Sequence, residues 1–521
     1  KQGGLWLALN NGISRVEIPS PLTFLNENYG PNGGVTDIAR CNDYLYFATY
    51  EGLYYLDEKT GRFSATPGIV STCWYVLSTE KGLLVATTEG VYVVEKQAVR
   101  KLTSQNLSFS LYRSHKNPSI VYAGEKNAVT ILQLTSNNWV NTGSIPCKYN
   151  EIRELVEDND GWVWIPTLSS GIIRFRACNS GIERPQISQF DTTRRLPSML
   201  GNHVALLDGR AIFLTPNGVM NYDEQKSIFV HNTSIDTSLR LEWLSKIIQD
   251  KEGNVWSTAG DDKKLTFYQR QINNGVIGYK KRQTPLLSIA TTTVWSVFVD
   301  TDAVWIGGPE GVIRYDQAAQ KNHTFSYPTF IRKVTLNQDS VLFEGSYFDS
   351  SKTTSLIQNP QFVYVLPYDQ NKLTFEFAAA TYDNPAANLY QYYLENFDEN
   401  WSELSKNFQK EYTNLPPGKY VFHTRAKNIH GKLGEEGIFK FEILVPWFKT
   451  WWAYSMYVLF GGGVLWLLFR WRLDQVEKEK RKLENIIEER TKEVVFQKEE
   501  IELASAELAN KNDELEKINA I

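Results

Sequence analysis

The sequence predicts a mainly β protein: a seven-bladed β-propeller, an Ig-like β-sandwich, one transmembrane helix and a long coiled-coil helix, in that order. Three observations lead to this fold class. An apolar pattern recurs through the first 326 residues, and short strands bounded by turns fill the next stretch. Nineteen uncharged residues then precede a helical stretch without Pro or Gly. A long-period repeat indicates an array of small sheets, and an uncharged stretch of this length indicates a membrane span.

The composition argues against several classes of function. The 521 residues carry a net charge of −4 with 22% charged residues, so no basic surface indicates a nucleic-acid partner. The cysteines Cys41, Cys73, Cys147 and Cys178 form no CxxC motif, so we expect no metal site and no cofactor, while a disulfide stays open. The chain begins at Lys1 without a leader, and we expect that an exported protein has lost one.

Residues 1–326 are predicted to form the propeller. The best copies of the repeat, 152–176 and 294–316, read as an apolar run, a turn, an apolar-aromatic strand, and a turn ending in Gly before another strand. The marker residue of the middle strand returns every 38 to 49 residues, at Trp6, Tyr46, Leu84, Tyr122, Trp164, Phe213, Trp256 and Trp305. This period suits four-stranded blades that bury both faces against their neighbours.

Two motifs recur inside the copies. Asp158–Gly161 and Asp250–Gly253 read as tight turns before a Trp strand, and their repetition favours a structural over a catalytic role. The copies resemble the two-component regulator propeller repeat, D-x-x-G-x-[LV]-W-[IV]-G-T-x-x-G. Seven complete copies predict seven blades, with eight as the alternative. The half copy at 4–17 is either a closing strand or the last piece of a preceding propeller, so 1–17 is expected to be a partial blade.

Residues 327–445 are predicted to form a β-sandwich, because short strands alternate with turns such as Leu415–Gly418. This region resembles the triple-tyrosine domain of bacterial sensors at Tyr390, Tyr392, Leu394, Trp401, Tyr412, Leu415–Tyr420, Ala426, Asn428 and Gly431. We expect the tyrosines to pack in the core and anchor turns, with their hydroxyls bonded at the sheet edge. A ligand-binding role for them is the alternative.

Residues 446–472 are predicted to cross a membrane. The uncharged stretch Trp451–Phe469 is roughly 28 Å long as a helix, close to the thickness of a bilayer's hydrocarbon core. Basic residues crowd one flank, at Arg470, Arg472, Lys478, Lys480, Arg481 and Lys482. The positive-inside rule therefore predicts a single-pass protein in contact with lipid, with its C-terminal helix in the cytoplasm. The resemblance to bacterial sensors implies that this membrane is the bacterial cytoplasmic (inner) membrane and that the N-terminal region is periplasmic. A buried helix of a soluble domain is the alternative.

Residues 473–521 are predicted to form a coiled coil, most simply a parallel homodimer. Apolar residues follow a heptad spacing at Leu473, Leu483, Ile487, Val494, Ile501, Leu508, Leu515 and Ile518. Arg490, Gln497 and Lys511 interrupt this seam, and they either hold its register or allow it to shift. The stretch Glu488–Thr491 resembles the signalling helices that join membrane spans to output domains.

A ligand is expected at a mouth of the propeller axis. Trp74, Arg153 and Trp295 open the first strands of three repeats, and they suit stacking on a sugar and bonding to its hydroxyls or acid group. The alternative, that both tryptophans fill gaps between blades, stays open. The sequence contains no Ser/His/Asp arrangement, HExxH or P-loop, so we expect no catalytic residues and no enzyme within this chain.

The two resemblances imply the ligand-sensing and signal-transmitting part of a bacterial membrane receptor of the two-component, hybrid sensor histidine kinase type. In that family the ligand is an oligosaccharide or similar small molecule. The resemblance also implies an output domain after Ile521, either a histidine kinase or another catalytic domain. Two alternatives remain. A propeller enzyme acting on polysaccharide would turn its ligand over, and a membrane-anchored scaffold would bind a protein instead.

Overall fold

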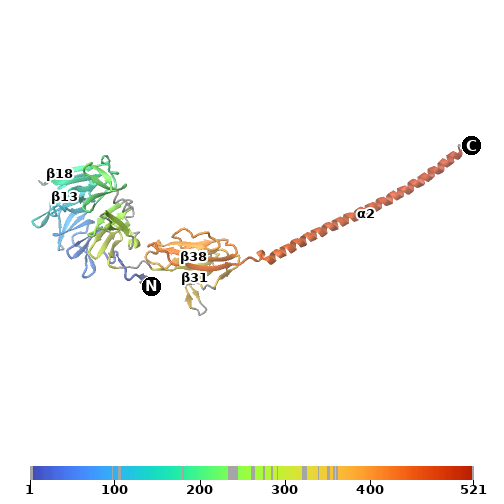
Figure 1. Ribbon diagram of the computed structural model, residues 1–521, viewed down its shortest axis with the longest axis horizontal. Coiled ribbons are helices and arrows are strands. Elements are labelled where there is room, and N and C mark those ends of the chain that lie inside the picture. The colour runs from blue at the N-terminus through green and yellow to red at the C-terminus, as the bar shows by residue number, and fades with distance from the viewer. Residues whose placement is uncertain are drawn as a thin grey trace. The chain divides into compact units, whose positions relative to one another are not determined.

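The computed structural model forms two compact units and a long helix (Figure 1). The first unit comprises Lys1–Tyr327 together with Ala380–Leu389 and Lys427–Glu435, and the second comprises the rest of the chain. The structure describes residues 4–96, 98–103, 107–178, 181–232, 244–259, 264–273, 276–282, 286–289, 292–319, 325–337, 340–348, 353–355, 358 and 362–518.

Seven sheets of three or four antiparallel strands follow one another in the described part of the first unit. The first sheet is β4 (Val35–Cys41), β5 (Tyr44–Thr49), β6 (Gly52–Asp57) and β7 (Arg62–Ala65). The second is β8 (Cys73–Thr79), β9 (Gly82–Thr87), β10 (Gly90–Glu95) and β11 (Ala98–Lys101). The third is β12 (Ser108–Arg113), β13 (Ile120–Thr135) and β14 (Asn138–Glu151). The fourth is β15 (Val156–Glu157), β16 (Val163–Pro166), β17 (Ile172–Cys178) and β18 (Gly181–Phe190).

The remaining three sheets repeat the same up-and-down order. The fifth is β19 (His203–Leu207), β20 (Arg210–Thr215), β21 (Gly218–Asp223) and β22 (Ile228–His231). The sixth is β23 (Leu244–Gln249), β24 (Val255–Ala259), β25 (Lys264–Asn273) and β26 (Val276–Arg282). The seventh is β27 (Ser296–Val299), β28 (Ala303–Gly308), β29 (Gly311–Asp316) and, as its fourth strand, β3 (Leu22–Leu25). Short 3-10 turns lie at η1 (Thr192–Arg194) and η2 (Leu286–Ile289).

Each sheet buries both faces, which explains why the second strands are apolar at consecutive positions. Every residue of β9 is buried, for example. Hydrophobic clusters join each sheet to the next in chain order. A further cluster joins the seventh sheet to the first, where Trp305 meets Phe47 with ring centroids 5.8 Å apart. The sheets therefore close into a ring and resemble propeller blades.

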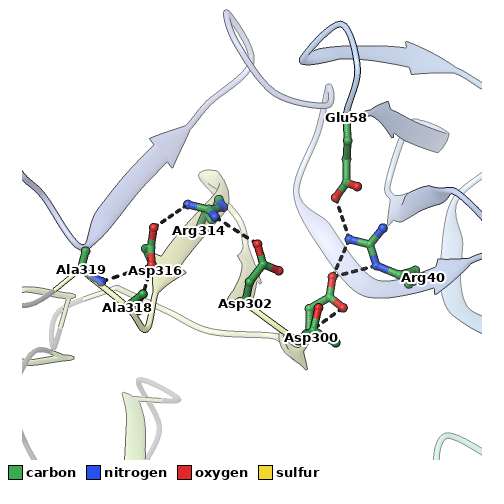
Figure 2. A network of polar contacts seen from close by, with 9 residues as sticks. Arg40, Glu58, Asp300, Asp302, Arg314, Asp316, Ala318 and Ala319 are labelled. Carbon is green, nitrogen blue, oxygen red and sulfur yellow. Dashed lines mark hydrogen bonds and ion pairs between the residues drawn. The ribbon is translucent and has the colours of Figure 1, made fainter.

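Polar contacts also cross the closure between the first and seventh sheets. Arg40 of β4 binds Asp300, which follows β27, and it also binds Glu58 of the first sheet (Figure 2). Arg314 of β29 lies nearby, and among the described residues it pairs only within the seventh sheet, with Asp302 and Asp316. Hydrophobic packing and a bridging ion pair thus hold the two ends of the array together.

One predicted alternative for the half copy at 4–17, that it supplies the closing strand of the ring, is wrong. Its strands β1 (Leu5–Leu9) and β2 (Gly12–Val16) pair only with each other among the described residues. The strand that completes the seventh sheet is β3, whose Leu25 lies opposite Val312 of β29. The closure combines an N-terminal strand with three C-terminal strands, so the ring is fastened by residues far apart in the sequence.

The second unit contains two four-stranded sheets. One is β31 (Ser340–Glu344), β30 (Thr329–Leu336), β35 (Leu373–Ala379) and β37 (Gln409–Tyr412). The other is β34 (Tyr364–Leu366), β39 (Gly437–Ile443), β38 (Gly418–Lys427) and β36 (Leu389–Leu394). A small pair, β32 (Tyr347–Phe348) with β33 (Thr354–Ser355), and the turn η4 (Trp447–Lys449) also belong to this unit. The turn η3 (Pro385–Ala387) lies in a segment of the first unit. Buried Phe375, from one sheet, stacks on Phe422 of the other with centroids 4.0 Å apart.

The helix α2 (Trp451–Ile518) runs through both the uncharged stretch and the heptad region without a break. Within the described residues it is the one helix that is long and apolar enough to cross a membrane. Its heptad residues are exposed along their whole length in the single chain, as Ile487 and Val494 illustrate. The backbone of Ile518 ends the helix, and its side chain lies outside the described part.

Candidate functional site

One end of the ring collects the start of each first strand and the turn between the second and third strands. In the first sheet, Val35 at the start of β4 lies opposite Thr49 at the end of β5, so the β5–β6 turn lies at the same end. First strands of neighbouring sheets lie side by side, including β27 beside β4 and β4 beside β8. Side chains that open these strands therefore gather at one mouth of the ring.

The structure connects all three predicted ligand-binding residues through two aromatic residues that the sequence reasoning missed. Tyr50, in the β5–β6 turn, makes edge contacts with Trp74 at 5.6 Å and with Trp295 at 5.3 Å. Phe109 of β12 lies 5.9 Å from the Trp74 ring, and the Arg153 guanidinium carbon lies 5.0 Å from the Phe109 ring. We call these five residues the aromatic row. Around the ring, they come in turn from the seventh, first, second, third and fourth sheets.

Local turn chemistry positions the row. Thr49 accepts the Glu51 amide and donates to the Gly52 carbonyl at 2.9 Å, and Gly52 has a φ of 129° that favours glycine. The same Thr-to-Gly bond recurs in other second turns, as at Thr87 and Thr215. This turn holds Tyr50 at the mouth, so the T-x-x-G motif was the signal that could have located it.

Trp295 fits its place because Gly34 has no side chain. A methyl group on Gly34 would lie 2.6 Å from Cζ3 of Trp295. Four of the five residues of the row are at least partly exposed, and Phe109 is buried. Tyr50 keeps 42% of its surface, and neither Trp74 nor Trp295 belongs to the hydrophobic clusters between sheets. The Nε1 of Trp74 is shielded from water and has no acceptor within the described structure, so a bound molecule could supply one.

One charged side chain belongs to the row, and two more lie on first strands, at Asp37 of β4 and Lys246 of β23. Arg153 is half-exposed and binds Glu151 through Nε at 3.1 Å and Nη2 at 2.8 Å. On β4, burial raises the pKa of Asp37 to about 6, while the charge of Lys246 on β23 and the amide of Val76 act in the opposite direction. The sequence reasoning missed Asp37 and Lys246, because nothing in their spacing predicts that two first strands bring them near each other.

The repeated aspartates have the structural role that was predicted. Asp158 accepts the amides of Asp160 and Trp162 through Oδ1 and the Trp164 indole N–H through Oδ2, at 2.6 Å for the indole. Asp250 makes the equivalent bond to the indole of Trp256 at 3.3 Å. Each carboxylate is thus occupied in bracing its own turn and strand.

The tyrosines of the second unit also act as predicted, as core and anchoring residues. Tyr412 is buried and donates to Asp398 at 2.6 Å, and burial together with this bond raises its pKa. Tyr420 donates to the carbonyl of Pro416 at 2.7 Å, and Tyr390 accepts the amide of Ala379. These bonds leave the hydroxyls at sheet edges and turns.

Neither metal nor disulfide chemistry is built into the described side chains. They contain no group of three His, Cys, Asp or Glu that could hold a metal ion. Cys41, Cys73 and Cys147 are buried free thiols, and burial raises the pKa of Cys73 to about 12. The side chain of Cys178 lies outside the described part.

Comparisons with known proteins agree with this architecture. Residues 381–444 match the Y_Y_Y domain family. The crystal structure of the extracellular domain of the hybrid two component system BT3049 from B. thetaiotaomicron is similar, with 16% identity, a TM-score of 0.57, and coverage of 85% of this chain and 60% of that one. The extracellular domain of BT4673, a one component system of the same organism, gives 16% identity, a TM-score of 0.44, and coverage of 86% and 62%.

The chain thus spans about 60% of the length of these relatives. No curated protein matches the chain. What the comparisons establish is that residues 381–444 are a Y_Y_Y domain, and that the chain shares its fold with the extracellular domain of a hybrid two component system.

Proposed function

We propose that this chain is the ligand-sensing and signal-transmitting portion of a bacterial two-component receptor. In this proposal the seven sheets are a seven-bladed propeller, and the second unit is an Ig-like sandwich. The observation that carries the proposal is the chain order. A Y_Y_Y domain ends at residue 444, and a helix begins at Trp451 whose uncharged first part, Trp451–Phe469, is of membrane length and which continues into the heptad seam. A propeller enzyme acting on polysaccharide would not need such a continuous connection.

The proposed ligand is an oligosaccharide or similar small molecule that binds the aromatic row. The partly exposed rings of Tyr50, Trp74 and Trp295 offer apolar faces for a sugar ring. Arg153 offers hydrogen bonds at the end of the row. The shielded Nε1 of Trp74 gains an acceptor when a hydroxyl group binds there. The row needs no turnover chemistry to perform this role, so binding is expected without catalysis.

The proposed topology follows from charge. Basic residues follow the apolar part of α2 at Arg470 and Arg472, which favours a cytoplasmic C-terminal helix and a periplasmic N-terminal region. The exposed heptad seam favours a homodimer, since a single solvated helix gains nothing from an apolar stripe. The ligand acts by binding one geometry of this dimer more tightly than the other, because equal affinity would shift no equilibrium.

Binding of oligosaccharides to the full chain in detergent, measured by calorimetry, tests the proposal. Trp74→Ala and Arg153→Ala should each weaken binding by about tenfold or more, because each removes a direct contact. Phe408→Ala is the matched control, since Phe408 is an exposed aromatic of the second unit and lies outside the row. Failure of every oligosaccharide to bind contradicts the ligand class, and cleavage of a bound oligosaccharide contradicts a purely sensory role.

A further inference from the structure

A cavity lies between the sixth and seventh sheets, lined by residues of both. It encloses about 280 Å³. Its walls are aromatic and apolar, with polar side chains at the rim: Trp256, Phe267, Tyr315, Leu286, Gln269 and Arg282. Burial, with a contribution from Asp316, raises the pKa of Tyr315, so its hydroxyl stays protonated and can donate a hydrogen bond.

Arg282 is the cation among the residues that line this cavity. Strand β26 carries exposed Lys280, Lys281 and Arg282, and none of the three has an ion-pair partner in the described part of the chain. Arg282 donates through Nε to Gln269 at 3.0 Å, which leaves its terminal N–H groups available. The adjacent carboxylate, Asp316, is already occupied by the amides of Ala318 and Ala319 and by Arg314 (Figure 2).

Strand register separates Arg282 from Lys281 and places Lys280, opposite Gln269, on the same face as Arg282. Arg282 lies opposite Phe267, which lines the cavity, whereas Lys281 lies opposite Tyr268. Side chains alternate along a strand, so Arg282 shares the face of Phe267 and Lys281 points to the other face. Lysines on an edge strand discourage pairing with a strand of another chain, and this role accounts for Lys281. The same role does not account for Arg282, which lies over an aromatic cavity.

We propose that this cavity binds a small carboxylic acid carried on a single ring. The ring packs among Trp256, Phe267 and Tyr315, and the carboxylate accepts paired hydrogen bonds from Arg282, the geometry that suits a guanidinium best. The volume falls just below the range of about 300–1,000 Å³ that is typical for drug-sized ligands, so one ring fits and an oligosaccharide does not. The site is separate from the aromatic row, and the proposed function does not depend on it.

Titration of the full chain in detergent by calorimetry tests this proposal, with benzoate, glucuronate and neutral benzamide as probes. At least one of the two acids should saturate with a Kd on the order of 1 mM, and benzamide should bind about tenfold more weakly than benzoate or not at all. Benzoate alone identifies an aromatic acid, and glucuronate alone identifies a sugar acid. No saturable binding by either acid, or equal binding of benzamide and benzoate, overturns the proposal.

Two exposed substitutions on β26 localise the site. Arg282→Gln should raise the Kd of the bound acid by about tenfold or more, because it removes a charge-assisted hydrogen bond. Lys281→Gln removes the same charge from the opposite face and should change the Kd by less than about twofold. Thermal unfolding should be the same for both variants, since both side chains are exposed. Equal weakening by the two substitutions would mean a general charge effect and would overturn the assignment.

Discussion

The guanidinium of Arg40 lies 2.5 Å from the carboxylate of Asp300, so one ion pair joins the first sheet of the ring to the seventh (Figure 2). Asp300 is nearly buried, with 6% of its side chain exposed. Removal of Arg40 would leave that carboxylate without its partner. We predict that Arg40→Ala lowers the free energy of unfolding by about 2–3 kcal/mol, because an unpaired buried charge is costly. Urea unfolding followed by tryptophan fluorescence measures the loss.

Arg314→Ala is the control for this prediction. Arg314 also forms two ion pairs, but at 3.4 and 3.6 Å and within one sheet, and its partner Asp302 is mostly exposed. Exposed pairs of this kind contribute about 0–1 kcal/mol. An equal loss of stability in the two variants would show that closure of the ring does not depend on the Arg40–Asp300 pair.

Asp37 predicts a pH dependence of stability. Burial raises its pKa from 3.8 to about 6 in the folded chain. A carboxyl group whose pKa is higher in the folded chain than in the unfolded chain stabilises the folded state when it is protonated. This contribution is complete at a pH below the unfolded pKa and is lost as the pH rises through the folded pKa. The free energy of unfolding should therefore fall between about pH 4 and pH 6, by up to about 3 kcal/mol.

Asp37→Asn should remove this pH dependence. The neutral amide can still accept the Val76 amide, so the variant should be more stable than the wild type at about pH 7 and similar at about pH 4. Lys246→Met should act in the opposite direction, because the charge of Lys246 lowers the pKa of Asp37. If the free energy of unfolding varied with pH in the same way for Asp37→Asn and the wild type, Asp37 would not be the source of the pH dependence.

Much of this architecture could be predicted from the sequence, because its determinants are local. The Asp158 turn and its bond to Trp164 use residues six positions apart, and the uncharged stretch and heptads need no tertiary contact to be recognised. The closing strand β3 could not be predicted in this way. Its four residues resemble no copy of the repeat, and its partner strand β29 begins at Gly311.

The residues of the aromatic row also divide into those that the sequence could identify and those that it could not. Trp74, Arg153 and Trp295 could be identified because each opens a first strand. Tyr50 and Phe109 could not be assigned to the row, since their role depends on which sheets become neighbours. Ligand binding by the row stays a prediction.

Gly34→Ala tests whether the position of Trp295 matters to the row. The added methyl group would lie 2.6 Å from the Trp295 ring and 3.2 Å from the backbone of Pro309, so the ring must move. We expect a stability cost of about 1–3 kcal/mol from overpacking. We also expect a changed indole N–H signal of Trp295 in NMR spectra and weaker oligosaccharide binding. Gly278→Ala is the control, because a methyl group there meets open space. An unchanged Trp295 signal in Gly34→Ala would contradict the steric argument.

The heptad seam of α2 makes the final prediction. Ile487 and Val494 are exposed by 59% and 60% in the single chain, and both occupy the same heptad position. In a parallel dimer, equivalent residues at this position lie against each other, so Ile487→Cys and Val494→Cys should each form a disulfide-linked dimer when membranes are oxidised. Lys492→Cys is the control, because Lys492 lies on the opposite side of the helix and pairs with Glu488 of its own chain. Efficient cross-linking at the seam with little at Lys492 supports the dimer, whereas equal cross-linking at all three positions indicates random collision and contradicts it.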